Sequence, residues 1–499
     1  MCGVLAGGVG IWNQVLDGAF AFKTLLAPTS DVQLVHITNP AANLAKALQI
    51  LTTAQATPQG QARIALLAAL ADVPGWFDPT SPEPAADDYV TREQNQFRWS
   101  AGVDFAFIFA FRAELEARAR GNPSWNTGVD YRKQLERSIN RDEVMALYQQ
   151  TGLNLEDDLR ILESAPRIAA DPHAVKYLIN NIIFDGQLQL PVLTMHTTGD
   201  GLVTVEHERA YARVVHAAGK DATLRQTYVH RAGHCTFTPA ETITAFQTLI
   251  HRLDTNNWGT ADNPQALNLV ASALGPNFNL WLVGNTPVPT APAFMQYQPA
   301  PFLRPFDTRN VVTTDITAPR SMAGYVDSKA PLKNFLGADY LWTGQDTRPQ
   351  THRSLHGVFQ FDLGGLPADA QVLEGQVQLM GGSSQYLNAG GGSWQLMLLN
   401  DSVDAGWTKL GYWQIHNAPT LGPARPTLTD QDIGSEIANT FELIPSQVGE
   451  IQSRLASSGK GSFRLDGDCT WPYGRHIFGW SAKASPSLQI TYFHESFVR

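Results

Sequence analysis

Cysteine, long apolar runs and clustered basic residues are scarce in this sequence, and each scarcity excludes a class of protein. The three cysteines, Cys2, Cys235 and Cys469, are too few and too scattered for a disulfide framework or a zinc site. No apolar run approaches the length that a membrane-spanning helix needs. The net charge of −10, without any lysine-arginine run, argues against nucleic acid or an anionic membrane as a partner.

Targeting and metal-binding patterns are also missing. Met1 is followed by Cys-Gly-Val-Leu, without a basic segment or a cleavage site, so the sequence predicts no signal peptide. His207-Glu208 begins like the zinc motif H-E-x-x-H, but Tyr211 stands where the second histidine is required. We therefore expect neither a metal nor a cofactor.

The composition that is present is typical of a globular protein with more than one domain. Hydrophobic residues make up 43% of the chain and charged residues 16%. A chain of 499 residues is too long for one hydrophobic core, so we expect at least two domains.

The segment 190–239 has the pattern strand, turn, helix, strand, turn. The apolar run 191–196 is typical of a strand in a parallel sheet and ends at Thr198-Gly-Asp-Gly201. Residues 205–218 carry an apolar stripe at helical spacing, and residues 223–230 alternate as a second strand. In a right-handed strand-helix-strand unit the two strands are parallel, so both turns lie at the same edge of the sheet.

Two residues in these turns can do chemistry together. Asp200 follows the first predicted strand and His234 follows the second. Open parallel sheets keep their active sites at this edge. A carboxylate that hydrogen-bonds an imidazole fixes its tautomer and stabilises its protonated form, as a general base requires. The alternative is that Asp200 caps a turn and His234 is an ordinary loop histidine.

These residues resemble the C-terminal part of an α/β-hydrolase. The resemblance lies in the G-D-x-x-V pattern at 199–203 and in Gly233-His234, with the histidine 34 positions after Asp200 (234 − 200). It implies that Asp200 is the acid of a catalytic triad and that His234 is its base. It covers about residues 1–300.

The nucleophile that the resemblance implies is missing. The family carries its serine in a G-x-S-x-G turn that precedes the acid and the histidine, and this motif does not occur here. Ser100 has no glycine two positions before it and falls in a helical stretch. Residues 1–5 are expected to form a strand buried on both faces, which makes the sequence look cut. We therefore expect the serine to lie outside this chain, in a separate or missing N-terminal half of the hydrolase.

Residues 11–187 have mostly helical patterns, which the resemblance interprets as a large cap inserted over the active site. After 234, a helix with apolar Ile243, Phe246 and Leu253 is expected to pack on the sheet, and 283–305 is expected to be an extended strap. The aromatic residues of the cap could line an acyl pocket, although most are expected to be core. These aromatics are Trp76, Phe77, Trp99, Phe105, Phe107, Phe109, Phe111, Trp125 and Tyr131.

From about 307 the hydrophobic period changes to two, which is typical of antiparallel strands. Seven alternating runs separated by turns predict a β-sandwich. The string at 355–367 and the strand after it resemble the jelly-roll modules called DNRLRE domains, which are related to carbohydrate-binding modules of secreted bacterial enzymes. Exposed tryptophans could stack on sugars, although core packing is expected for at least half of Trp394, Trp407, Trp413 and Trp471.

The sequence thus predicts a partial α/β-hydrolase with a helical cap at 1–300 and an all-β jelly-roll sandwich at 301–499. The expected function is a secreted serine-type carboxylic-ester hydrolase, acting on an ester or a polymeric substrate. Its extracellular location rests only on analogy with the sandwich modules. Two alternatives stay open: an inactive truncated hydrolase that serves as a binding or structural module, and a peptidase of the same fold.

Overall fold

The computed structural model describes residues 5–283, 285–306, 310–387, 391–469 and 474–494. The chain divides into two compact units, the first formed by Met1–Ala170 and Tyr177–Phe306, and the second by Asp171–Lys176 and Asp307–Arg499. Within the described ranges, no helix combines the length and the apolar character that crossing a bilayer requires.

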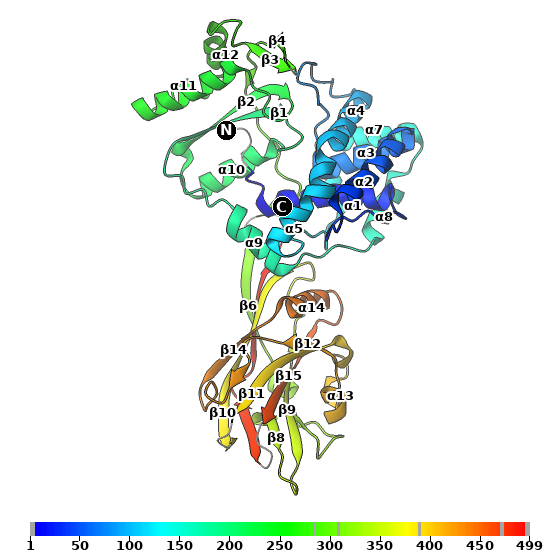
Figure 1. The fold of residues 1–499 in the computed structure, drawn as a ribbon, viewed down its shortest axis with the longest axis vertical. Helices are drawn as coiled ribbons and strands as arrows, with labels where there is room; N and C mark the ends of the chain where they lie inside the picture. Colours follow the sequence, from blue (N-terminus) through cyan, green and yellow to red (C-terminus); the bar gives the residue numbers. More distant parts are fainter. Residues whose placement is uncertain (1–4, 284, 307–309, 388–390, 470–473, 495–499) are drawn as a thin grey trace. The chain divides into compact units, whose positions relative to one another are not determined.

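The first unit begins with a helical region built around its own apolar core (Figure 1). Its α-helices are α1 (Gly8–Leu25), α2 (Pro40–Gln55), α3 (Pro58–Ala71), α4 (Tyr89–Trp99), α5 (Arg112–Ala119), α6 (Tyr131–Arg137), α7 (Arg141–Thr151) and α8 (Leu155–Ser164). Helix α9 (Pro172–Ile182) follows and contributes its first residues to the second unit. Two of these helices, α2 and α3, begin with a side-chain cap and a proline in the first turn, at Asn39-Pro40 and Thr57-Pro58.

Within the mostly helical stretch 11–187, residues 100–119 do not form one regular α-helix. Two π-helical turns, η1 (Ser100–Asp104) and η2 (Phe107–Phe111), precede α5. The four phenylalanines of this stretch form two contacting pairs, and the members of each pair are four positions apart. Phe105 and Phe109 pack against Phe22 in the core, whereas Phe107 and Phe111 are exposed against each other.

A small sheet with helices on both faces completes the first unit. Strands β1 (Val192–Gly199) and β2 (Leu224–Ala232) pair in parallel, and β5 (Phe294–Met295) pairs antiparallel with β2. Helix α10 (Glu206–Ala217) packs on one face, with η3 (Asp221–Thr223) after it. Helices α11 (Pro239–Thr255) and α12 (Pro264–Ala273) pack on the other, as Figure 1 shows. The predicted strand-helix-strand unit is therefore present.

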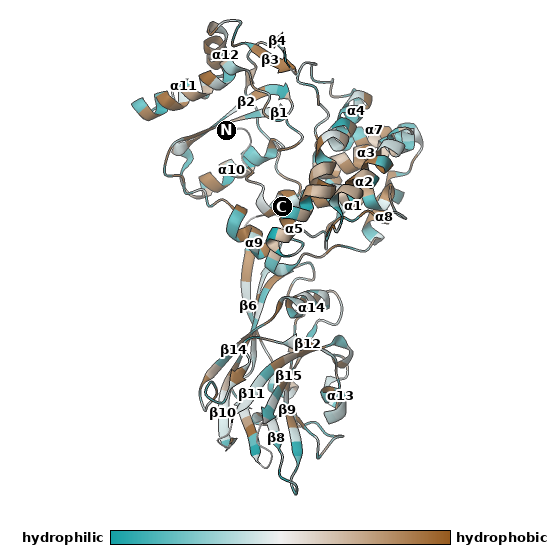
Figure 2. Cartoon of the chain, viewed as in Figure 1, coloured by the Kyte–Doolittle hydropathy of each residue, from teal (hydrophilic) through white to brown (hydrophobic). Residues whose placement is uncertain are grey.

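Helix α11 differs from its prediction in what it buries. Of the residues expected to pack on the sheet, Phe246 and Leu253 are exposed, and so is Ile250. The buried side chains are Ala240, Glu241, Thr244 and Ala245, near the start of the helix. Figure 2 shows that hydrophobic segments continue along the rest of α11. The sheet of the described residues has only three strands, so it covers only the beginning of this helix.

One further expectation is mostly untested, and another needs correction. The strand expected at 1–5 falls mostly outside the described residues, and Leu5, which is described, is exposed and belongs to no strand. The strap expected at 283–305 is not a free linker. It follows β3 (Leu280–Val283), contains β4 (Thr286–Pro289) and β5, and ends with buried Leu303 and Arg304. Arg304 pairs with Asp17 inside the helical core, because a buried carboxylate needs a countercharge.

The second unit is a large antiparallel β-structure. Its strands are β6 (Val311–Thr317), β7 (Ala323–Asp327), β8 (Tyr340–Asp346), β9 (Arg353–Asp362), β10 (Gln371–Leu387), β11 (Gly392–Leu399), β12 (Thr420–Pro423), β13 (Leu428–Thr429), β14 (Ala438–Glu442), β15 (Lys460–Cys469), β16 (Arg475–Ser481) and β17 (Ser487–Phe493). Its helices are η5 (Arg320–Met322), η6 (Asp401–Val403), η7 (Trp407–Lys409), α13 (Tyr412–His416) and α14 (Pro445–Leu455).

Strand order along the main path of this sheet is β12-β11-β15-β9-β8-β16-β10-β17-β6. The long strand β10 pairs with β17 and β14 through its first part and with β16 through its last part, with register shifts between them. The alternating side chains build a main apolar core, which includes Phe359, Phe463 and Trp480, and a smaller cluster includes Val358, Trp407 and Tyr412. The seven predicted runs lie in or overlap β9, β10, β11, β14, β15, β16 and β17, and strands β6, β7, β8, β12 and β13 were not predicted.

The tryptophans of the second unit separate into core and surface. Trp394 and Trp407 are buried, so they pack in the core and are not exposed. Trp413 on α13 is 55% exposed and lies edge-on to the ring of Tyr412. Trp471 lies outside the described residues.

Candidate active site

The acid loop follows β1 directly. Asp200 comes after Gly199, the last residue of the strand, and its side chain is only 2% exposed. Its Oδ1 accepts hydrogen bonds from the backbone N–H groups of Leu202 (2.9 Å) and Val203 (3.0 Å). Gly201 cannot be replaced without movement, because a Cβ there would lie 2.4 Å from the indole of Trp99. The loop therefore holds the carboxylate through Oδ1 and leaves Oδ2 for a different partner.

The histidine loop follows β2 at the same edge of the sheet. Gly199 pairs with Ala232, and the N–H of Gly233 donates to the carbonyl of Gly199 at 3.0 Å. His234 comes next, between two residues with left-handed backbone conformations, Gly233 (φ +94°) and Cys235 (φ +58°). Parallel pairing thus brings the ends of β1 and β2 together, as the sequence pattern predicted.

Asp200 and His234 meet through a direct hydrogen bond. Nδ1 of His234 lies 2.8 Å from Oδ2 of Asp200, and the imidazole is 33% exposed. The hydrogen bond to Asp200 raises the pKa of His234, burial opposes this, and the negative charge of Asp200 adds to the rise. The bond places the proton on Nδ1 and leaves Nε2 with a lone pair, which is the arrangement that a general base needs.

No hydroxyl nucleophile stands beside this base within the described residues. The ring of His234 has Asp200 as its hydrogen-bond partner there, and no serine bonds to Nε2. Ser100 is buried in the π-helical turn η1, consistent with the prediction that it is a helix residue. Cys235 is disulfide-bonded and therefore carries no free thiol. The catalytic role of Asp200 and His234 stays a prediction.

A second carboxyl group near Asp200 was not predicted. Asp104 ends η1, and its Oδ2 is buried without a hydrogen-bond partner among the described residues. Burial, and then the negative charge of Asp200, raise the pKa of Asp104 to about 8. Asp104 therefore keeps its proton to about pH 8. Nothing in the helical pattern of this stretch distinguishes Asp104 from a solvent-facing residue.

Two tryptophans of the helical region border the acid loop. The ring of Trp99 lies against Gly201, and the ring of Trp76 lies against Gly199 and the imidazole of His230. The indole of Trp99 donates to the carbonyl of Trp76 at 2.9 Å. Of the aromatic residues considered for an acyl pocket, these two therefore lie next to the predicted acid, whereas Phe105 and Phe109 belong to the helical core.

Comparison with known proteins finds one informative similarity. No family model matches the chain. An o-phthalyl amidase of Xanthobacter agilis is 30% identical over 291 residues, which cover 53% of this chain and 64% of that protein. The chain thus spans somewhat less than two thirds of the length of the curated relative that it matches. Over about half of its length, this mixed α/β and β-rich chain is similar to a protein that is named as an amidase.

Proposed function

We propose that this chain is the larger part of a serine-type hydrolase of the α/β-hydrolase kind, which cleaves a carboxylic amide or ester bond. The observation that carries the proposal is the 2.8 Å hydrogen bond between His234 and Asp200 at the carboxyl ends of two parallel strands. The similarity to a protein named o-phthalyl amidase supports a hydrolytic reaction.

In the proposed mechanism, Nε2 of His234 removes the proton from a serine hydroxyl as that oxygen attacks the carbonyl carbon of the substrate. Asp200 keeps the proton of the neutral ring on Nδ1 and stabilises the imidazolium that forms. The imidazolium then gives its proton to the leaving amine or alcohol. Water hydrolyses the acyl-enzyme in a second round of the same proton transfers. The serine comes from outside this chain, either from a longer form of the protein or from a separate N-terminal hydrolase segment.

The amide and the ester are supported as substrates by different arguments. The name of the relative favours an amide, and a phthalyl amide is the first compound to test. The expected ester hydrolysis uses the same acid and base, and a peptidase differs only in the pocket that selects the acyl group. We therefore propose acyl transfer as the reaction and treat amide, ester and peptide as the three substrates to compare.

The second unit is proposed to be a DNRLRE-like jelly-roll module that attaches the enzyme to a polymer. Its antiparallel strands and the large apolar core between them support a sandwich, and the exposed Trp413 offers a ring for stacking. The disulfide at Cys235 supports an extracellular location, because disulfides persist in oxidising compartments. The alternative function is an inactive hydrolase that acts only as a binding module, which the lack of a serine beside His234 in the described part of the chain favours.

Labelling with a fluorophosphonate probe separates these functions. We expect labelling only when a longer form or a co-purifying polypeptide supplies the serine, and we expect His234→Ala to abolish it. Labelling of this polypeptide that disappears in Ser100→Ala, but not in the control Ser124→Ala, would contradict an external nucleophile. Lack of labelling in every form of the protein would favour the binding module.

A further inference from the structure

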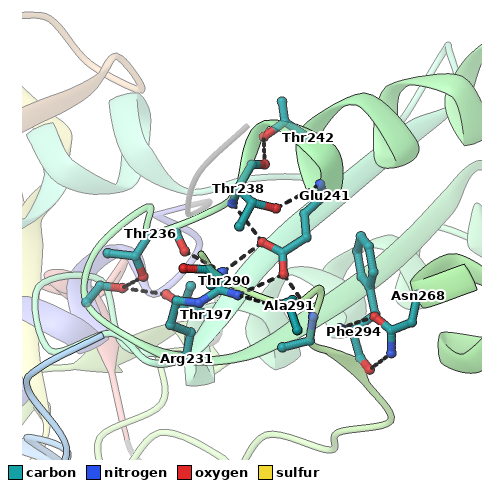
Figure 3. A network of polar contacts seen from close by, with 12 residues as sticks. Thr197, Arg231, Thr236, Thr238, Glu241, Thr242, Asn268, Thr290, Ala291 and Phe294 are labelled. Carbon is teal, nitrogen blue, oxygen red and sulfur yellow. Dashed lines mark hydrogen bonds and ion pairs between the residues drawn. The ribbon is translucent and has the colours of Figure 1, made fainter. Parts of the chain in front are cut away.

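A buried ion pair lies beneath the loop that carries His234. Arg231, in β2, and Glu241, in the first turn of α11, have side chains that are 4% and 0% exposed. Nη1 and Nη2 of Arg231 donate to the two carboxylate oxygens of Glu241 at 2.7 and 3.0 Å. This two-point contact fixes the plane of the guanidinium group, as Figure 3 shows.

The ion pair also makes hydrogen bonds to the backbone around it. Arg231 also donates to the carbonyl of Thr236 at 2.7 Å and to that of Ala291 at 3.2 Å. Glu241 accepts from the N–H of Thr238 at 2.8 Å and from that of Ala293 at 2.9 Å. Four backbone groups from two separate segments thus converge on one buried pair.

The near end of the loop is held separately. Oγ1 of Thr197, in β1, donates to the carbonyl of Gly233 at 2.6 Å. Thr197 and Arg231 therefore hold Gly233 and Thr236, and only His234 and Cys235 lie between the two anchors. Because both strands supply an anchor, the loop is tied to the same edge of the sheet that carries Asp200.

The backbone of this loop is strained at Cys235, so the loop needs interactions that hold it in place. Cys235 has a left-handed backbone, which costs a non-glycine residue about 1 kcal/mol or more. Such a conformation persists only where the surroundings impose it. A Cβ on Gly233 would lie 2.6 Å from Cγ2 of Thr236, so the turn is also tightly packed.

We propose that Arg231 and Glu241 are positioning residues, whose ion pair holds residues 233–236 in the conformation that sets the His234 ring against Asp200. The inference rests on the proposed function, because it gives that site a support that the acid and base alone do not provide. A fixed imidazole matters for catalysis, since a misplacement of about 1 Å can cost about 100-fold in rate.

The test uses Arg231→Met together with Glu241→Gln in the full chain. Removing both charges avoids an unpaired buried ion, and the amide oxygen introduced by Glu241→Gln would keep an acceptor for the N–H of Thr238. The readout is the pKa of His234 from an NMR titration, with its signal assigned by comparison with His234→Gln. We expect the pKa to fall toward about 6.5, the value of a free histidine, and kcat/KM to fall about 10- to 100-fold.

The matched control is Asp17→Asn with Arg304→Met, which removes an equally buried pair of the first unit whose described partners include Trp125, Tyr131 and Gln134. It should leave the pKa of His234 unchanged. If the first double variant does not fold, Thr197→Val removes the other anchor with little change in volume and should lower the same pKa.

An unchanged pKa of His234 in a folded anchor variant would overturn the positioning role, whatever the loss of stability. A lowered pKa in a protein that hydrolyses nothing in any form would support the positioning role and refute the proposed function. The two inferences can therefore fail separately.

Discussion

Replacing Asp200 by asparagine tests the chemistry of the site with little change in shape. The N–H groups of Leu202 and Val203 donate to one oxygen of Asp200, at 2.9 and 3.0 Å. In Asp200→Asn these donors keep the amide oxygen on their side, so the amide nitrogen takes the position of Oδ2. That nitrogen donates where the carboxylate accepted. Nδ1 of His234 must then accept, and the proton moves to Nε2.

The expected loss follows from this change of tautomer. With its proton on Nε2, the ring cannot take a proton from a hydroxyl, and the charge that stabilised the imidazolium is gone. We expect kcat/KM to fall about 10⁴-fold, which corresponds to about 5.4 kcal/mol of transition-state stabilisation. The pKa of His234, which the Asp200 hydrogen bond raises, should fall to about 6.5 or below.

Two measurements check this prediction. Hydrolysis of a phthalyl amide, with the serine-bearing segment present, gives the rate as a function of pH. In the unmodified protein the rate should increase as His234 loses its proton, with a midpoint above about pH 6.5 because the folded pKa is raised. NMR titration gives the pKa and the tautomer without any substrate. An unchanged pKa and tautomer in a folded Asp200→Asn variant would refute the reasoning.

Two further predictions concern buried charges of the first unit. Arg304→Met leaves Asp17 buried without its countercharge, so we expect a loss of about 3–5 kcal/mol in the free energy of unfolding, measured by chemical denaturation. Asp104→Asn removes a carboxyl group that holds its proton to about pH 8 when folded but only to about pH 4 when unfolded. In the unmodified protein this group therefore lowers stability as the pH rises from about 4 to 8. The variant should gain melting temperature relative to the unmodified protein, more at pH 8 than at pH 5.

Each of these two changes has its own control. Adding Asp17→Asn to Arg304→Met removes the unpaired carboxylate and should recover most of the stability, and a single variant that loses less than about 1 kcal/mol would contradict the argument. A stability difference for Asp104→Asn that is the same at pH 5 and pH 8 would show that Asp104 is ionised normally.

Local sequence pattern was sufficient for the elements around Asp200 and His234. The apolar run before Thr198, the helical stripe of α10 and the alternation of β2 each lie within a few residues of the observed bounds. These signals depend on which side chains meet one face of one element, so they can be read from neighbours in the chain. The handedness of the crossover then places Asp200 and His234 at one edge.

The supports of the site were decided by tertiary structure. The pattern around Arg231 does not show that its guanidinium group meets Thr236 and Glu241 beyond the turn, or Ala291 sixty positions later. The burial of Asp104 beside Asp200 likewise depends on how the helical region packs, and so does the exposure of Phe246 on α11. Periodicity shows which face of a helix is apolar. Whether another element covers that face is settled only when distant parts of the chain come together.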